Sequence, residues 1–283
     1  MRRVHIVTDS TAQLDPKLVD KLDIKVLPLE IHFGNQRFLE GVDMSTEEFF
    51  HRVAHSSVMP TSTAPSVEQF RQIYSELSRK TDKIVSLHVS SKLNQTCQNA
   101  RIAANDFLGR CEIVIIDSWT ISLGLAILVE AGAQVALEEA PLDDVVRTIR
   151  GMIPHIYAVF FTDLLDYLER EQRISKSQSI LGTMLSIKPF LTIEEGEILP
   201  IEKMRTRDKA VDKLLEFVAE FSRIKQLAIL RSALQLSEEA RSLSERLRSS
   251  CPDLDFATIT YGPTLATHIG PHSLGLIVYE GTG

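Results

Sequence analysis

The 283-residue chain lacks the common sequence motifs of nucleotide, metal and hydrolase chemistry. It has no GxxxxGK[ST] loop and no GxGxxG after its first apolar run, so no motif supports nucleotide binding. HExxH and GxSxG are also absent, and the eight histidines do not have the spacing of metal ligands. We therefore predict no catalytic residue, no metal and no cofactor, and the motifs point away from an enzyme.

Cysteine is scarce as well, and acidic residues outnumber basic ones. Cys97, Cys111 and Cys251 are odd in number and far apart, which fits neither a disulfide framework nor a CxxC metal site, so we expect reduced thiols. The formal net charge is −7, and no stripe of Lys and Arg is visible. Because proteins that bind nucleic acids or anionic membranes usually carry a basic surface, we expect neither partner.

Long hydrophobic runs are missing too. The most apolar stretch, 121–137, contains Glu130 and is shorter than the ~20 residues of a membrane span, so it predicts a buried helix. Near the N-terminus, Asp9 interrupts the apolar run too early for the core of a secretion signal. We expect a cytoplasmic protein without stable membrane insertion.

What the chain does have is an alternation of strand and helix patterns, with 44% hydrophobic and 24% charged residues. In the first half, capping boxes at Ser45 and Ser66 predict helix starts, and apolar runs predict strands. The predicted strands cover residues 4–8, 83–89 and 112–116, and residues 24–33 form a further extended run that Pro28 punctuates. This alternation predicts an α/β fold whose N-terminal domain, residues 1–152, has a parallel, Rossmann-like sheet.

The second half predicts a different sheet. Residues 189–192 and 197–201 flank the turn Glu194-Glu195-Gly196 and predict a hairpin. The other predicted elements are strands 156–161, 226–230, 255–260 and 274–279, and helices 162–186, 208–221 and 237–249. A hairpin within a strand–helix alternation predicts a second, mixed-sheet α/β domain over residues 153–283.

Hydroxyl side chains gather at turns that are predicted to follow strands. These segments are Asp9-Ser10-Thr11, Thr61-Ser62-Thr63, Ser90-Ser91 with Asn94-Gln95-Thr96, and Ser118 with Thr120. The carboxyl ends of parallel strands meet at one sheet edge, where helix N-termini favour anions, so these turns could bind a carboxylate without a cationic side chain. Each Ser or Thr could equally be a helix cap or a turn residue, and the residues alone leave both interpretations open.

A further candidate is His268, which precedes the Gly270-Pro271 turn and the last predicted strand. An imidazole at this place could donate to an anion near neutral pH. It could also be an ordinary surface or turn residue, and the sequence alone does not bring it near the Thr61 segment.

Eight segments, in order along essentially the whole chain, resemble the DegV family, which includes the fatty-acid-binding subunits of bacterial fatty acid kinase. They are Ile6-Val7-Thr8-Asp9-Ser10-Thr11, Pro60-Thr61-Ser62-Thr63-Ala64-Pro65, Ser90-Ser91-Lys92-Leu93-Asn94-Gln95-Thr96, Ile116-Asp117-Ser118, Arg173-Ile174-Ser175-Lys176, Lys188-Pro189, Arg205-Thr206 and Thr267-His268-Ile269-Gly270-Pro271. The resemblance implies a two-domain α/β protein with one long-chain fatty acid, such as a C16–C18 acid, buried between or within the domains.

The resemblance also implies which residues contact the fatty acid. The carboxylate would be held at Thr61, with Ser62 beside it, at Asn94 and at His268. Supporting residues at the site edge would be Asp9, Ser10, Ser91, Ser118 and Gly270. Arg173 and Arg205 would serve docking to the kinase.

Two places depart from the family pattern. Asn94-Gln95 stands where the family has Ser-Gly, and Asn can still donate through its amide nitrogen. Glu171-Gln172 stands where the family usually has Gly-Gly, and we expect a reshaped turn there because Glu and Gln resist the conformations that glycine allows.

The acyl chain needs only an apolar tunnel, because each buried methylene contributes about 0.8 kcal/mol before costs. Candidates in the second domain, which could equally be ordinary core, are Phe160, Phe161, Leu164, Leu165, Leu181, Met184, Leu185, Ile187, Phe190 and Leu191. We expect a non-catalytic protein that binds a fatty acid and presents its carboxylate to a separate fatty acid kinase. The alternatives are an enzyme acting on a small carboxylate or phosphate at the same sheet edge, and a lipid sensor or storage module without a kinase partner.

Overall fold

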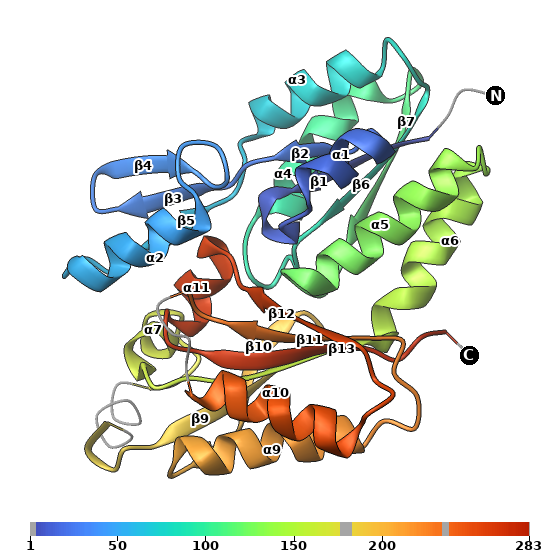
Figure 1. The fold of residues 1–283 in the computed structure, drawn as a ribbon. Coiled ribbons are helices and arrows are strands. Elements are labelled where there is room, and N and C mark those ends of the chain that lie inside the picture. Colours follow the sequence, from blue (N-terminus) through green and yellow to red (C-terminus); the bar gives the residue numbers. More distant parts are fainter. Residues whose placement is uncertain (1–3, 176–182, 234–237, 283) are drawn as a thin grey trace. The chain divides into compact units, whose positions relative to one another are not determined.

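The computed structural model describes residues 4–175, 183–233 and 238–282, and contacts divide the chain into two units (Figure 1). The first unit is Met1–Met44 with Thr61–Pro154, and the second is Ser45–Pro60 with His155–Gly283. The predicted domains met at a single boundary after residue 152. The contacts instead group helix α2 (Thr46–His55) with the second unit. Phe50 of this helix packs edge-to-face on Tyr261 with ring centroids 5.4 Å apart, so its apolar side joins that unit's core.

The first unit is built on a four-stranded sheet of order β2-β1-β6-β7 (Figure 1). Its strands are β1 (His5–Asp9), β2 (Lys25–Leu27), β6 (Lys83–His88) and β7 (Glu112–Asp117), and all neighbouring pairs are parallel. The predicted parallel sheet is therefore confirmed. Such sheets are covered on both faces, which explains why β1 and β6 are almost continuously buried.

Helices cover both faces of this sheet (Figure 1). One core cluster joins the sheet to α3 (Val67–Leu77) and α4 (Thr96–Ala104), while α5 (Leu123–Leu137) and α6 (Leu142–Met152) pack on the other side, together with α1 (Pro16–Leu22). Both predicted capping boxes are present: Ser45 caps α2 with Glu48, and Ser66 caps α3 with Gln69. The predicted buried helix is α5, and no helix in the described part of the chain is long and apolar enough to cross a membrane.

A second, three-stranded sheet of order β4-β3-β5 was not predicted. It contains β3 (Glu30–Phe33), β4 (Gln36–Leu39) and β5 (Thr61–Thr63), paired antiparallel. The extended run predicted over 24–33 is interrupted at Pro28 as expected and forms two strands, β2 and β3, because proline lacks the N–H that a continuous ladder needs. The prediction that Thr61-Ser62-Thr63 forms a turn after a strand is also wrong, since these residues are β5 itself.

The second unit has a six-stranded sheet of order β10-β9-β8-β13-β11-β12. Its strands are β8 (Ile156–Phe161), β9 (Lys188–Glu194), β10 (Glu197–Met204), β11 (Gln226–Arg231), β12 (Phe256–Thr260) and β13 (Leu274–Tyr279). The β9–β10 hairpin confirms the predicted turn, and β11–β12 is the parallel pair in an otherwise antiparallel sheet. The predicted mixed-sheet α/β fold is confirmed.

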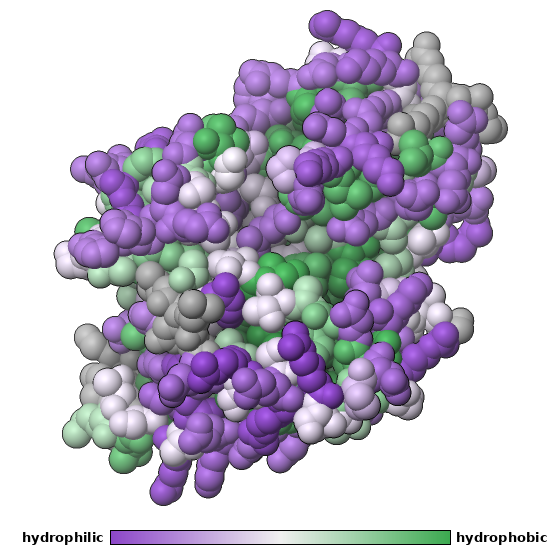
Figure 2. All heavy atoms as spheres, in the orientation of Figure 1, coloured by the Kyte–Doolittle hydropathy of each residue, from purple (hydrophilic) through white to green (hydrophobic). Residues whose placement is uncertain are grey.

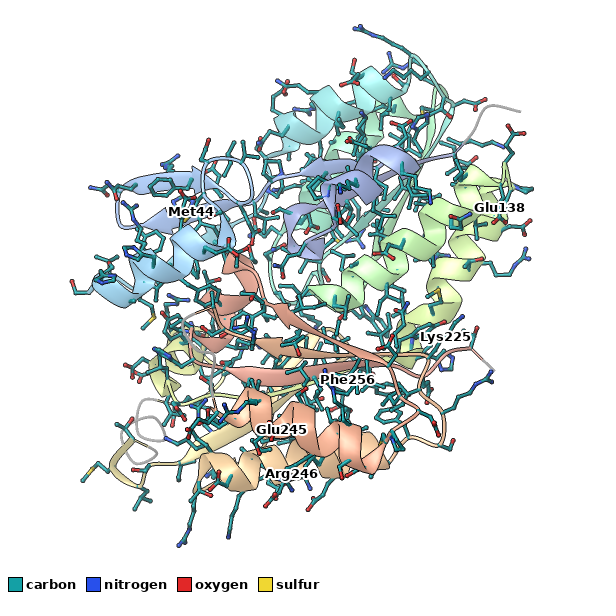
Figure 3. The ribbon with its side chains drawn as sticks, viewed as in Figure 1. Met44, Glu138, Lys225, Glu245, Arg246 and Phe256 are labelled. Carbon is teal, nitrogen blue, oxygen red and sulfur yellow. The ribbon has the colours of Figure 1, made fainter. Side chains whose placement is uncertain are left out.

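Two helices, α9 (Arg207–Ala219) and α10 (Glu238–Ser250), cover one face of this sheet (Figure 1). Their outward side is mostly hydrophilic, as Figure 2 shows. Arg246, labelled in Figure 3, projects from α10 and pairs with Asp212 of α9 at 2.8 Å. The two helices therefore bury their apolar stripes on the sheet and carry charge outside.

Two short helices of the second unit carry residues of interest. The predicted mostly helical stretch 162–186 is interrupted: α7 covers Leu165–Arg170 and the chain turns at Gln172, whose φ is +58°, while residues 176–182 of the stretch lie outside the described residues. The other helix, α11 (Pro263–Ile269), was not predicted, and it places His268 in its last turn. Pro263 at the first position and Gly270 just past the end fit the usual asymmetry of helix ends.

Candidate functional site

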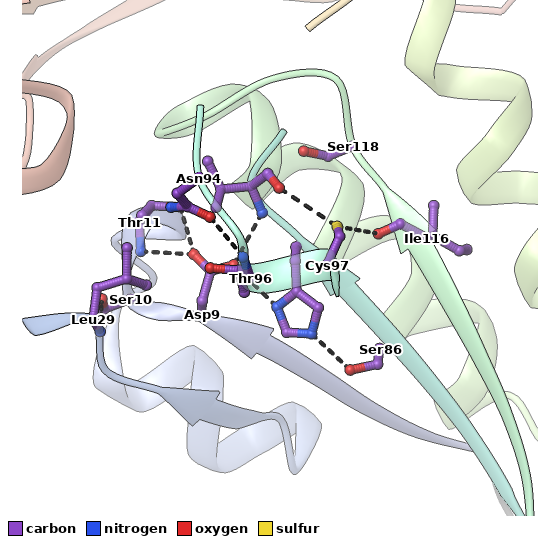
Figure 4. Close-up of polar contacts among 12 residues, drawn as sticks. Asp9, Ser10, Thr11, Leu29, Ser86, Asn94, Thr96, Cys97, Ile116 and Ser118 are labelled. Carbon is purple, nitrogen blue, oxygen red and sulfur yellow. Dashed lines mark hydrogen bonds and ion pairs between the residues drawn. The ribbon is translucent and has the colours of Figure 1, made fainter. Parts of the chain in front are cut away.

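Asp9 ends β1 at the edge of the parallel sheet and is fully buried (Figure 4). Its carboxylate accepts hydrogen bonds from Thr11 N and Oγ1 at 3.1 and 2.6 Å, from His88 Nδ1 at 3.0 Å and from Val89 N at 2.9 Å. These four donors saturate the carboxylate, so Asp9 has no remaining capacity to contact a ligand. Its place is to join the short helix η1 (Ser10–Ala12) to the segment that follows β6.

Behind Asp9, a chain of hydrogen bonds runs through the core of the first unit. The Tyr74 hydroxyl donates to Ser86 Oγ at 2.7 Å, and Ser86 Oγ lies 2.6 Å from His88 Nε2. Since Asp9 accepts from Nδ1, the neutral imidazole accepts from Ser86 at Nε2. Ser86, His88 and Asp9 have the order of a hydrolase triad, but all three are completely buried, so a substrate has no access to the Ser86 oxygen.

Three other predicted edge residues make contacts within the first unit. Ser10 donates to Glu40 Oε2 at 2.6 Å and accepts from Leu29 N at 3.0 Å. Ser118 is buried and its hydroxyl donates to Thr120 O at 3.1 Å. Ser91 is exposed and its backbone N–H points to the Asp117 carboxylate at 3.2 Å. These contacts fix the loops after β1, β6 and β7.

Asn94 lies at the entrance of α4, beside these loops (Figure 4). Its Oδ1 accepts from Thr96 N at 2.9 Å, whereas its Nδ2 is buried and has no partner among the described residues. The same is true of the hydroxyls of Thr96 and Thr120. Because buried polar groups are normally hydrogen-bonded, these unpaired groups make the loops around Asn94 a candidate place for a ligand.

Thr61 and Ser62 belong to β5. Thr61 is exposed and is the register partner of His32, while Ser62 pairs with Ile31. Cross-strand partners share one face of a sheet, so Thr61 lies on the same face as His32, Glu30 and Thr63. The Thr61 hydroxyl is thus presented on a polar sheet face rather than at a helix N-terminus.

His268 is the predicted site residue of the second unit, and only 3% of it is exposed. Its Nδ1 lies 3.3 Å from Glu171 Oε2, and its Nε2 is buried without a partner among the described residues. The Arg170 guanidinium donates to the backbone oxygen of Thr267, the residue before His268, and to that of Pro60, the residue before Thr61, the latter at 2.6 Å. Through these contacts Arg170 and Glu171 fix the position of the C-terminal turn of α11.

Glu171 is ionised in this setting. Burial alone would raise the pKa of its carboxyl group, but the hydrogen bond from His268 and the nearby guanidinium groups of Arg170 and Arg173 hold that pKa below its ordinary value.

Comparison with known proteins identifies the family. The sequence pattern of the DegV family, described as one of uncharacterised proteins, matches residues 3–281. This chain belongs to the DegV family. A DegV domain-containing protein of Caldanaerobacter subterraneus is 31% identical over 99% of this chain and 100% of its own.

Two solved DegV structures share the fold. A DegV family protein of Thermus thermophilus, which binds fatty acid, is 29% identical with a TM-score of 0.85, and the match covers 99% of this chain and 100% of that chain. DegV of Bacillus subtilis, a fatty acid binding protein, is 25% identical with a TM-score of 0.84 over the same shares.

The two departures from the DegV pattern have different structural meanings. Gln95 has φ −91° and ψ 10°, a conformation open to any residue, so this backbone does not require the family's glycine. Gln172 instead has φ +58°, a left-handed conformation that favours glycine, and its N–H donates to Glu169 O at 2.9 Å. Glu171 contributes the partner of His268, a role that the sequence did not reveal because the two lie far apart in the chain.

Gly270 also has a backbone role. Its φ is +85°, its N–H donates to Ala266 O to end α11, and its carbonyl accepts from the buried Tyr261 hydroxyl at 2.9 Å. A Cβ at this position would lie within 3.4–3.5 Å of Tyr167 and Leu164. Gly270 thus supports His268 by shaping the end of its helix.

The two arginines predicted to dock a kinase differ in exposure. The side chain of Arg173 is only 7% exposed, and it donates to Ile198 O of β10 at 2.8 Å. This is the environment of a structural arginine, which contradicts the predicted surface role. Arg205 is exposed and lies between β10 and α9. Lys176, the last residue of the matched segment that begins at Arg173, lies outside the described residues.

The apolar side chains predicted for the acyl tunnel separate into three groups. Phe161 and Phe190 belong to the core under α9 and α10, whereas Phe160 and Leu191 are buried side chains outside that cluster. Met184 and Leu185 are 77% and 66% exposed, so they do not line a buried tunnel in this structure. Leu181 lies outside the described residues.

Proposed function

We propose that this protein binds one long-chain fatty acid and that Asn94, Thr61 and His268 are contacts of its carboxylate. The observation that carries the proposal is that Asn94 Nδ2 and His268 Nε2 are buried and unpaired among the described residues. An unsatisfied buried group costs about 1–3 kcal/mol, which a bound carboxylate recovers by accepting from it. The fatty acid binding of the DegV relatives from Thermus and Bacillus supports the choice of ligand.

The head group in this proposal is neutralised by dipoles and one imidazole rather than by an Arg or Lys. Ser62 lies next to Thr61 on β5 with its side chain on the opposite face of the sheet, so its contribution is through the strand rather than through a hydroxyl beside that of Thr61. Asp9, Ser10, Ser91 and Ser118 act indirectly, because their contacts fix the loops around Asn94. The acyl chain, with about 14–18 methylene groups of about 0.8 kcal/mol each before costs, needs only apolar walls such as Phe160 and Leu191.

The first experiment is native mass spectrometry of the purified protein, followed by solvent extraction and identification of any lipid. We expect a stoichiometric C16–C18 fatty acid, and uptake of added fatty acid by delipidated protein. Protein that is empty and also fails to take up fatty acid would overturn the proposal.

Substitutions then test the head-group contacts. We expect Asn94→Leu and His268→Leu each to weaken binding about tenfold or more, because each removes a hydrogen bond to a charged acceptor worth about 1.5–3 kcal/mol. Asn105→Leu and His55→Leu, at exposed positions, are the matched controls and should bind like the parent protein. If Asn94→Leu and His268→Leu also bind like the parent, the carboxylate lies elsewhere.

We further propose that the bound carboxylate is presented to a separate fatty acid kinase, which forms the acyl phosphate, while this protein itself is non-catalytic. Transfer of labelled phosphate from ATP to bound fatty acid should require an added bacterial fatty acid kinase. Arg205→Ala should slow that transfer, and Arg223→Ala, another exposed arginine, should not. Phosphate transfer by this protein alone would contradict a purely binding role.

A further inference from the structure

Glu171 is the carboxylate that contacts His268. It follows α7 directly, its side chain is 27% exposed, and its Oε2 lies 3.3 Å from His268 Nδ1. Its other oxygen, Oε1, lies 3.5 Å from Arg170 Nη2. The carboxylate is therefore held between an imidazole and a guanidinium.

The contact with Glu171 determines which nitrogen of the His268 imidazole carries the proton. An ionised carboxylate can only accept, so the Nδ1 that faces Glu171 carries the proton. A neutral imidazole then presents a lone pair, not an N–H, at Nε2. His268 can donate to a fatty-acid carboxylate from Nε2 only as the imidazolium, which has a proton on both nitrogens.

We infer that Glu171 is a positioning residue that holds His268 as an imidazolium against the ligand carboxylate, so that binding of the fatty acid takes up a proton. This inference rests on the proposed function, since it assumes a carboxylate at Nε2. The complex places one positive imidazolium between two carboxylates, Glu171 and the ligand. The added proton comes from solvent and stays on the imidazole, and no bond other than hydrogen bonds is made or broken.

Among the described residues of the second unit, three charged groups lie at or near the contact between His268 and Glu171. Glu171 is the ion-pair partner, Arg170 contacts Glu171 and the Thr267 carbonyl, and Arg173 is near enough to influence the Glu171 carboxyl. Helix α2 also packs against α11, but none of its described side chains lies within ion-pair distance of His268. The Glu171 carboxylate is thus the negative group positioned to stabilise the imidazolium.

The test compares fatty acid affinity against pH, from about 6 to 9, for the parent protein, Glu171→Gln and Asp166→Asn. Gln keeps the size of the side chain and loses its charge, so this variant removes the negative group beside the imidazole. We expect the pH at which affinity falls to be about one unit lower in Glu171→Gln, with near-parental affinity at pH 6 and about tenfold weaker binding above pH 8. Asp166→Asn removes an exposed carboxylate from α7 and should follow the parent. His268→Gln has no imidazole, so its profile gives the contribution of the fatty acid's own titration.

A second measurement does not depend on a variant that folds. Calorimetry of the parent protein in two buffers of different ionisation enthalpy measures the protons taken up on binding, and we expect up to one at the pH where affinity falls.

Each outcome separates the two proposals. If the parent protein binds no fatty acid, the proposed function fails and the role of Glu171 with it. If the parent binds but takes up no proton at any pH, the inference alone is overturned. An unchanged Glu171→Gln profile, or a Glu171→Gln affinity lowered equally at all pH values, also overturns it, because the latter is the mark of a merely structural residue.

Discussion

Replacing Ser86 with alanine removes the hydroxyl that links Tyr74 to His88 in the core of the first unit. Both contacts are short, at 2.7 and 2.6 Å, and all three side chains are fully buried. The change therefore leaves two buried polar groups without a hydrogen-bond partner: the Tyr74 O–H as a donor and His88 Nε2 as an acceptor.

The expected magnitude follows from that count. A buried group left unsatisfied costs about 1–3 kcal/mol, so we expect Ser86→Ala, which leaves two of them, to lower the free energy of unfolding by about 2–6 kcal/mol. Tyr74→Phe removes only the outer end of the chain, because Ser86 still donates to His88, and should cost about 1 kcal/mol. In the double variant Ser86→Ala/Tyr74→Phe, only His88 Nε2 lacks a partner. Its loss of unfolding free energy should therefore be smaller than the sum of the two single losses by about 1 kcal/mol or more.

Urea unfolding followed by far-ultraviolet circular dichroism measures these free energies. Ser249→Ala, at an exposed position of α10, is the control for loss of a serine hydroxyl and should change stability little. If Ser86→Ala costs no more than Tyr74→Phe, or if the two effects add, the directional chain from Tyr74 to Asp9 is refuted.

Three further predictions concern single positions. Gln172→Gly should raise the free energy of unfolding by about 0.5–1 kcal/mol in urea titrations, because relief of the left-handed conformation outweighs the entropy of glycine; a loss of stability would contradict this. Ser66→Ala should cost about 1 kcal/mol in the same assay by breaking the capping box of α3, while Ser222→Ala, at an exposed loop position, should cost almost nothing. The hydrogen bond from His155, opposed by burial and aided by Tyr157, lowers the pKa of Glu280, so this carboxylate stabilises the fold above its unfolded pKa and the stability is lost as pH falls through the folded pKa. Thermal unfolding between about pH 3 and 6 should therefore show a shallower acid decline in Glu280→Gln, and an unchanged slope would show that the pair contributes nothing.

Local patterns predicted the elements well where one physical signal dominates. The capping boxes at Ser45 and Ser66 mark helix starts because their hydrogen bonds join residues three positions apart. The strands β8 and β13 and the β9–β10 turn were predicted within a residue or two because continuous apolar runs and a Glu-Gly turn are local features. The small sheet β4-β3-β5 escaped prediction, since β5 pairs with β3 across about thirty residues of chain.

For the candidate site too, some features could be predicted from the sequence and others depended on the tertiary structure. The sequence by itself determined the α/β class and the DegV resemblance, because these depend on residue types and their order, and Thr61, Asn94 and His268 are candidates that follow from that resemblance. Only the tertiary structure decided that Asp9 is saturated by four donors, that Arg173 is buried, and that Glu171 faces His268. The physical reason is that hydrogen-bond saturation and burial are set by groups from distant parts of the chain, such as Glu171 and His268, which are 97 residues apart and meet only when α7 and α11 pack together.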